Sequence, residues 1–226
     1  VGGVEAHGPN LPGRTDSVLA EAPACAAVPA LAAHGWRALV LPAVHYTAAP
    51  FAAGFPGTVS ISPATLSALL RDIAESLEQQ SISALVVVNS HLDPAHLASI
   101  REVAGEGRRM PVIHPDLTSR HLARRLSTEF RSGACHAGRY ETSVVMAEAP
   151  ALVRDNVRRG LPGLPVSLSD AIRRGARSFE DAGMSNAYCG DPADATAREG
   201  RETIRTLGRI VADAVTERME GGGADD

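Results

Sequence analysis

The first sixteen residues contain three side chains that together can bind a metal ion. Glu5 and His7 stand two positions apart on an apolar run typical of a strand, so both side chains leave the same face. A turn rich in Gly and Pro follows, and Asp16 ends it just before a long helical pattern. Taken alone, Asp16 is better explained as a helix N-cap. Beside Glu5 and His7 it completes a ligand set for a divalent ion, because an unpaired buried carboxylate is costly.

A second pair of this kind follows a later apolar run. His91 and Asp93 stand two positions apart at the end of the run that begins at Val86. The carboxyl ends of parallel strands lie at one edge of a sheet, where ligands usually bind. Five nitrogen and oxygen donors from two strand ends favour two metal ions that share one carboxylate. The alternative is that His91 and Asp93 are solvated loop residues.

A third segment, from Cys135 to Ser143, supplies groups that can move protons. His136 precedes a glycine turn, and Glu141 follows five residues later. We interpret His136 as a proton carrier and Glu141 as the acid that orients it. The neighbouring Cys135 leaves a cysteine hydrolase as a further option, although adjacent residues seldom point at each other.

The pattern of the chain predicts alternating helices and strands. We expect helices over 17–34, 63–79, 94–104, 118–130 and 196–219, strands over 37–44, 84–89 and 111–113, and either a helix or a buried strand over 141–149. Such alternation is typical of an α/β protein with three α/β/α layers and a mainly parallel sheet. We expect one domain over residues 1–220 and a disordered tail over residues 221–226.

Composition narrows the possible partners. The chain has 226 residues and a net charge of −4, without a run of basic residues, which argues against nucleic acid or an anionic membrane surface as a partner. We find no apolar stretch that approaches the roughly 20 residues of a membrane span. No signal segment is apparent, and because the chain starts without Met inside an apparent strand, we expect that a few residues precede Val1. Three widely spaced cysteines favour the reducing cytoplasm.

Four motifs in this order resemble the creatininase (creatinine amidohydrolase) family. They are Glu5–Asp16 (EAHGPNLPGRTD), Phe55–Ser60 (FPGTVS), Asn89–Asp93 (NSHLD) and His136–Ser143 (HAGRYETS). The resemblance runs from Gly2 to about Arg218 and implies a homohexamer of α/β/α subunits with two divalent ions each, usually zinc or manganese, with iron a further candidate.

The resemblance also assigns roles to individual residues. It implies that Glu5, Asp16 and His91 bind one ion, and that His7, Asp16 and Asp93 bind the other. His136 matches a proton-transferring histidine, and Glu141 matches the acid of the same motif. Two positions depart from the family pattern: Asn10 stands where many members have a second histidine, and Asp93 stands where creatininase itself has a longer glutamate ligand.

These observations predict a metal-dependent amidohydrolase. A hydroxide that bridges the two ions would attack a carbonyl, and His136 would protonate the leaving nitrogen. The substrate would be a cyclic amide, a formamide or a peptide-like molecule, and residues 45–60 and 155–195 would set the specificity. The alternative is a catalytically degenerate protein of this fold that binds a small ligand or a partner, which the shorter Asp93 would favour.

Overall fold

The computed structural model describes residues 1–221. Five of the described helices have ten or more residues: α1 Thr15–Ala33, α2 Pro63–Glu78, α3 Pro94–Ala104, α6 Arg139–Glu148 and α9 Ala197–Glu220. The shorter elements are α4 Arg120–Ala123, α5 Thr128–Ser132, α7 Asp155–Arg158, α8 Leu168–Arg173 and the 3₁₀ turns η1 Pro50–Ala52, η2 Pro150–Leu152 and η3 Pro192–Asp194. Of the predicted tail, all but Gly221 lies outside the described residues.

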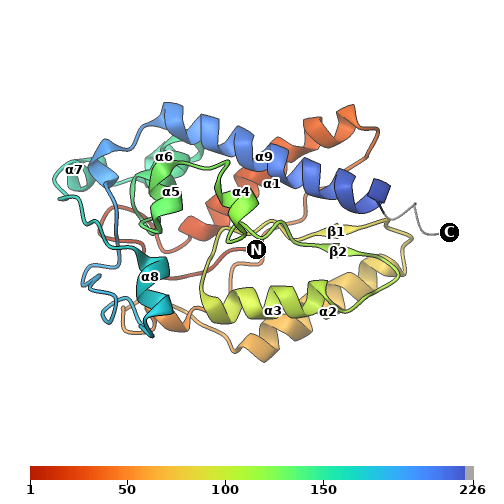
Figure 1. Cartoon of the computed structure of the whole chain (residues 1–226), viewed down its shortest axis with the longest axis horizontal. Helices are drawn as coiled ribbons and strands as arrows, with labels where there is room; N and C mark the ends of the chain where they lie inside the picture. The colour runs from red at the N-terminus through yellow and green to blue at the C-terminus, as the bar shows by residue number, and fades with distance from the viewer. Residues whose placement is uncertain (222–226) are drawn as a thin grey trace.

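Three layers are visible around the two strands. Strands β1 (Leu85–Val86) and β2 (Val112–Ile113) are parallel, with Leu85 opposite Val112. Helices α2 and α3 lie on one side of the strands, and α1 and α9 lie on the other (Figure 1). The predicted α/β/α sandwich is therefore confirmed. Helices α5, α6, α7 and α8 gather at the end of the molecule away from the strands (Figure 1).

Local sequence signals explain where the main helices begin and end. Ser62 accepts a hydrogen bond from the Thr65 backbone N–H, and Pro63 occupies the first turn of α2. Thr196 caps α9 in the same way. Gly35 follows α1 with a φ of +81°, a left-handed conformation that glycine adopts without strain. The segment that was ambiguous between helix and strand is helix α6.

Three predicted elements differ from the structure. Residues 37–44 form no strand; their backbone is joined to a neighbouring segment by the bond from Gly2 N to Val44 O (2.9 Å), and Leu39 is 86% exposed. A strand requires a ladder of such bonds along one edge. The predicted strand over 84–89 shortens to β1. The predicted helix over 118–130 is broken, because Ser127 accepts from Phe130 N and starts α5 anew.

Helix α1 corrects the expectation that no segment is long and apolar enough to span a membrane. Its 19 residues meet that criterion by length and composition, but half of them are buried inside the protein. Leu19 and Val18 belong to the same apolar cluster as Leu207 and Ile210 of α9. Helix α1 therefore has the packing of a core helix.

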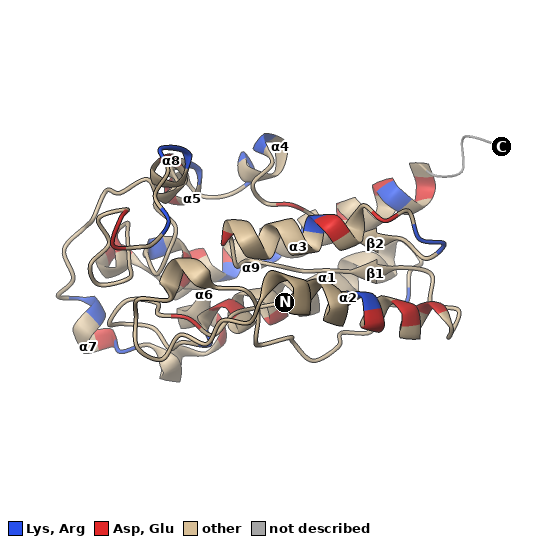
Figure 2. Cartoon of the chain, turned by 90° about the horizontal axis from the view of Figure 1, so that it is seen from below, with Lys and Arg blue, Asp and Glu red and all other residues tan. Residues whose placement is uncertain are grey.

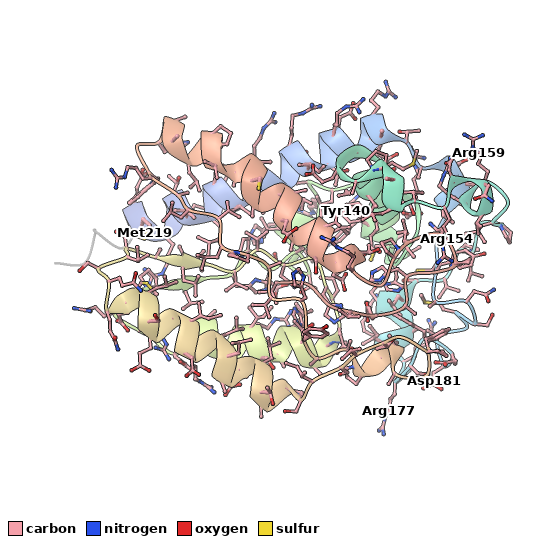
Figure 3. The ribbon with its side chains drawn as sticks, turned by 180° about the vertical axis from the view of Figure 1, so that it is seen from behind. Tyr140, Arg154, Arg159, Arg177, Asp181 and Met219 are labelled. Carbon is pink, nitrogen blue, oxygen red and sulfur yellow. The ribbon has the colours of Figure 1, made fainter. Side chains whose placement is uncertain are left out.

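Charged side chains lie on the outer surfaces of this core. Both basic and acidic residues lie on α2, α3 and α7 (Figure 2). In Figure 3, Tyr140 of α6 lies in the interior, whereas Arg159 and Arg177 project at the periphery. The buried acidic and histidine side chains described next are exceptions to this separation of charge and core.

Candidate metal centre

Four of the five predicted metal ligands meet at one buried point. Asp16, in the first turn of α1, lies between two histidines: its Oδ1 is 3.3 Å from His7 Nε2, and its Oδ2 is 3.1 Å from His91 Nδ1. Glu5 Oε1 lies 3.3 Å from the same His91 nitrogen. All four side chains are buried. Asp16 therefore stands at the centre of the arrangement, as the sequence predicted for a shared carboxylate.

The turn between His7 and Asp16 produces this convergence. Gly8 adopts a φ of +61°, and Glu5 N donates to Gly13 O at 3.1 Å, so the chain folds back on itself. Gly3 leaves the space that the carboxylate needs, because a Cβ there would lie 2.8 Å from Asp16 Oδ2. Gly3 and Gly8 thus both help to place Asp16.

Asp93, the fifth predicted ligand, lines the same pocket but has other partners. Its Oδ1 accepts from Ala95 N at 2.8 Å, which caps α3, and its Oδ2 accepts from Phe51 N at 3.0 Å. The groups of residues whose donor atoms lie close enough to share an ion are Glu5 with Asp16 and His91, His7 with Asp16 and Glu141, and Glu5 with His7 and His136. Among the described residues, Asp93 is in none of these groups.

Glu141 faces the predicted metal ligands and not His136. It lies in the first turn of α6, with Oε2 3.6 Å from His7 Nε2 and accepting from Ala137 N at 2.7 Å. The His136 Nε2 is paired instead with the Ala6 carbonyl at 2.9 Å. Within residues 1–221, we find no hydrogen bond between the Glu141 and His136 side chains, so the predicted orienting contact is not formed.

Three atoms of this cluster that could bind a metal ion have no hydrogen-bond partner within residues 1–221. They are Glu5 Oε2, His7 Nε2 and Asp16 Oδ2. Buried polar atoms are normally hydrogen-bonded, so each exception requires an explanation. Donor atoms that lie 3.1–3.6 Å apart without hydrogen-bond geometry have the arrangement of ligands directed at a common cation.

The electrostatics of the cluster lead to the same conclusion. Burial lowers the pKa of the His7 imidazole, but Asp16, Glu141 and Glu5 outweigh burial and raise this pKa to about 10. Burial raises the pKa of Glu141 to about 8. Three carboxyl groups thus surround two histidines in a site with little solvent. In the metal-free protein, protons on the two histidines balance the carboxylates, and a bound cation would replace those protons.

His136 is electrostatically different from the other histidines. Burial, together with the neighbouring His7, lowers the pKa of its imidazole to about 3. The ring lies between His7 and Phe179, with centroids 4.3 Å from each. His136 is therefore a neutral imidazole at the wall of the pocket.

The structure argues against the cysteine nucleophile. Cys135 lines the pocket, but burial and the nearby Cys189 and Glu141 raise the pKa of its thiol well above the usual value. A nucleophilic cysteine requires a lowered pKa, because the thiolate is the reactive form. Cys135 has the opposite environment.

The comparison with known proteins decides the family. The creatininase model, described as creatinine amidohydrolase, matches residues 1–215. The chain belongs to the creatininase family. It is 32% identical over 223 residues to the mycofactocin precursor peptide peptidase of Mycolicibacterium smegmatis, covering 95% of this chain and 82% of the relative.

Solved structures of the family share the fold. A creatinine amidohydrolase described as putative, from Bacteroides fragilis, superposes with a TM-score of 0.71 at 24% identity, covering 96% of this chain and 86% of that one. A mutant creatininase in a Zn–Zn form gives a TM-score of 0.68 at 21% identity, covering 96% and 88%. Another creatininase of this fold is a manganese form.

Three residues that shape the site without offering it a ligand atom were not predicted from the sequence. The Asn89 side chain donates to His91 O at 2.8 Å and accepts from His91 N at 3.1 Å, which fixes the turn that presents this histidine. Phe51 and Phe179 pack edge to face in the pocket wall, 5.6 Å apart. They come from the two loops predicted to set specificity, but nothing in those loops marks either ring as a pocket residue.

Proposed function

We propose that this member of the creatininase family is a dinuclear metal-dependent amidohydrolase that cleaves a C–N bond. The observation that carries the proposal is the buried convergence of Glu5, His7 and His91 on Asp16, with unpaired donor atoms at the centre. A protein that needed only a stable core would gain nothing from burying these groups unpaired.

The donor spacing fits two ions that share Asp16. Ligands about 2.1 Å from a tetrahedral ion lie roughly 3.4 Å from one another. The contacts of Asp16 with His7 and His91 are 3.3 and 3.1 Å, and that of Glu5 with His91 is 3.3 Å. Imidazole and carboxylate donors suit zinc, manganese and iron. When bound, two such ions would polarise the substrate carbonyl and lower the pKa of a water molecule towards neutrality.

His136 would move the proton that amide cleavage requires. Since the Ala6 carbonyl can only accept, the His136 Nε2 carries the hydrogen and leaves Nδ1 as the basic nitrogen. Nδ1 lies 3.8 Å from Glu5 Oε1, on the side of the ligand cluster. We propose that Nδ1 takes up a proton during attack and returns it to the leaving nitrogen.

The pocket favours a peptide-like substrate over a small polar one. The pocket has an apolar wall formed by Phe51, Leu168, Ile172 and Phe179. Such a wall suits an apolar side chain next to the scissile bond. The relatives named as mycofactocin precursor peptide peptidases support a peptide substrate for this chain. Cyclic amides and formamides remain the other members of the proposed substrate class.

We further propose a homohexamer that works in the cytoplasm. The resemblance to creatininase supports the hexamer, and the three free cysteines support a reducing compartment. Light scattering at micromolar concentration tests the assembly; a monomer would contradict it.

A panel of amides tests the proposed activity. The purified protein is stripped with a chelator, reloaded separately with Zn²⁺, Mn²⁺ and Fe²⁺, and assayed on peptides with an apolar or a charged residue beside the cleaved bond. We expect hydrolysis that requires metal and is faster with the apolar residue. Two bound ions without turnover of any amide would favour the degenerate ligand-binding protein instead.

A further inference from the structure

We propose that the arginines between Ile172 and Phe179 bind a carboxylate of the peptide substrate. This inference rests on the proposed function and narrows its substrate class to a peptide with two features: an apolar residue that packs on the pocket wall and a carboxylate a few residues away. The carboxylate belongs either to an acidic side chain or to the C-terminus of the peptide, and the experiment distinguishes these two sources.

The position of these arginines follows from the two ends of their segment. Ile172 of α8 and Phe179 both line the pocket. Residues 173–178 connect them, and a chain of this length that must return to the wall cannot move farther than roughly 12 Å from it. Gly175 turns the chain with a φ of +99°, and its N–H donates to the Ile172 carbonyl at 3.0 Å, which holds the turn against α8. The segment therefore forms part of the rim of the pocket.

This part of the rim is strongly basic. Of its six residues, three are arginines and none is acidic, in a chain whose net charge is −4. We call Arg173, Arg174 and Arg177 the arginine rim. Arg173 forms an ion pair with Asp170. Arg174 and Arg177 are exposed, and neither forms an ion pair within residues 1–221. Arg177 projects outward in Figure 3. Two guanidinium groups are thus available to a ligand.

The acidic residues that follow the rim are engaged elsewhere. Asp181 Oδ2 accepts from the backbone N–H of Arg177 at 3.0 Å, which closes the turn and not an ion pair with the guanidinium. The carboxylate of Glu180 lies over Gly54, where a Cβ would overlap it. An arginine guanidinium matches the geometry of a carboxylate, because two parallel N–H groups can donate to its two oxygens. A carboxylate is therefore the ligand that the rim favours.

The wall and the rim together define the substrate. The apolar wall suits an apolar side chain, and the arginine rim begins at the next residue after Ile172. An extended peptide advances about 3.3–3.6 Å per residue, so the carboxylate should lie within about three residues of the side chain on the wall. A cyclic amide or a formamide is too small to reach both features. The rim therefore favours a peptide over the other members of the proposed substrate class.

Two sets of peptides test the preference and identify the source of the carboxylate. In the first set, both ends are blocked, Phe packs on the wall, and Glu, Gln or Lys occupies one position up to three residues away. In the second set, all side chains are neutral, and the C-terminus is either a free acid or an amide. The ratio kcat/KM is measured for the Zn²⁺-loaded full chain. We expect Glu to exceed Gln and Gln to exceed Lys in the first set, or the acid to exceed the amide in the second. Equal values throughout both sets would overturn the proposal.

Matched variants assign the preference to the rim. In Arg174→Ala/Arg177→Ala, the preference for the carboxylate should fall by roughly 5–25-fold, because each exposed ion pair contributes up to about fivefold. Arg174→Lys/Arg177→Lys keeps the charge and should keep part of the preference. The control is Arg205→Ala/Arg209→Ala, which removes the same charge from exposed positions of α9. An unchanged preference in the first variant, or an equal fall in the control, would refute the assignment.

A binding measurement separates this inference from the proposed function. The same peptides, labelled with a neutral dansyl group, are titrated with the metal-free full chain, and fluorescence anisotropy reports their affinity. We expect the peptide with the carboxylate to bind more tightly than its neutral counterpart, and the difference to shrink at high salt. If wild type cleaves no peptide, the proposed function fails, and the binding result alone decides the role of the rim. Equal affinities would refute that role even in an active enzyme.

Discussion

Two helix starts border the pocket, and they use their carboxylates in opposite ways. Helix α3 is capped by its own Asp93, whose side chain accepts from Ala95 N. Helix α6 begins at Gly138, which has no side chain to cap it, and Glu129 of α5 accepts from its first backbone N–H groups. The residue that caps a helix loses its oxygens to the backbone. A carboxylate remains available for other chemistry when a different residue performs the capping.

The largest effect should follow from removing the residue that both ions would share. Asp16→Ala takes a ligand from two of the three donor groups, the two that Asp16 would join, so we expect loss of both ions and of all metal-dependent turnover. His91→Ala should remove the ion at Glu5 first and leave residual metal at His7. The number of metal ions per chain and the activity are measured for both variants, and Asp16→Ala should lose more of each than His91→Ala. Full metal occupancy in Asp16→Ala would show that the cluster is not a metal centre.

We expect His136 to affect the rate of turnover but not the binding of metal ions. His136→Asn should keep its ions and its melting temperature but lose roughly 10²–10⁴-fold in turnover, the usual contribution of general acid–base catalysis. His7→Asn is the control, because it should lose metal and activity together. All three quantities are measured on one preparation. A normal rate in His136→Asn would reject the proton-transfer role.

The Glu141 carboxyl group of α6 should make the free energy of unfolding of the metal-free protein depend on pH. Burial raises the pKa of Glu141 from 4.5 to about 8, so the folded state keeps a proton that the unfolded state loses. This contribution to stability is complete below pH 4.5 and disappears as the pH rises towards 8. Glu141→Gln should remove this loss of stability at higher pH.

Thermal denaturation between pH 4.5 and 8 makes the comparison. Each 1 kcal/mol recovered by Glu141→Gln should raise Tm by roughly 2–4 °C for a chain of this size. If the Tm of wild type and that of Glu141→Gln change with pH in parallel, then Glu141 is ionised in the folded protein even without metal.

The smallest expected effect follows from changing Asp93, the residue that caps α3. Asp93→Ala should lower the free energy of unfolding by about 1–3 kcal/mol, because α3 loses its cap and Phe51 N loses its acceptor. Asp93→Asn, which keeps one oxygen, should lose less. Urea denaturation measures both variants in the metal-free protein. If Asp93→Ala and wild type are equally stable, then the hydrogen bonds that Asp93 accepts from Ala95 N and Phe51 N do not stabilise the start of α3.

Much of the candidate site could be predicted because the side chains that converge there lie in short motifs. Glu5, His7 and Asp16 are linked by one turn whose glycines and prolines are readable, and His91 follows an apolar strand. The role of Asp93 could not be read, because its second partner, Phe51 N, lies 42 residues away in the sequence. A spacing pattern identifies side chains that can ligate, but it does not show which of them the backbone occupies first.

The fold was predictable to a similar extent. Helices with a cap and a clear period, such as α2 and α9, were placed within one or two residues. The predicted strand over 37–44 failed, because apolar character alone does not supply the neighbouring backbone that a ladder needs. The helix predicted over 118–130 failed at Ser127, whose hydroxyl offers the backbone an alternative partner.

The contact between α6 and α9 makes the site vulnerable at a position that no motif contains. A Cβ at Gly200 of α9 would overlap the backbone oxygen of Ser143 in α6, two residues after Glu141. Any side chain at position 200 must push the two helices apart and carry Glu141 with them. A related sequence could thus retain every ligand and still be inactive, and genome surveys that score this family by its motifs alone would count it as an enzyme.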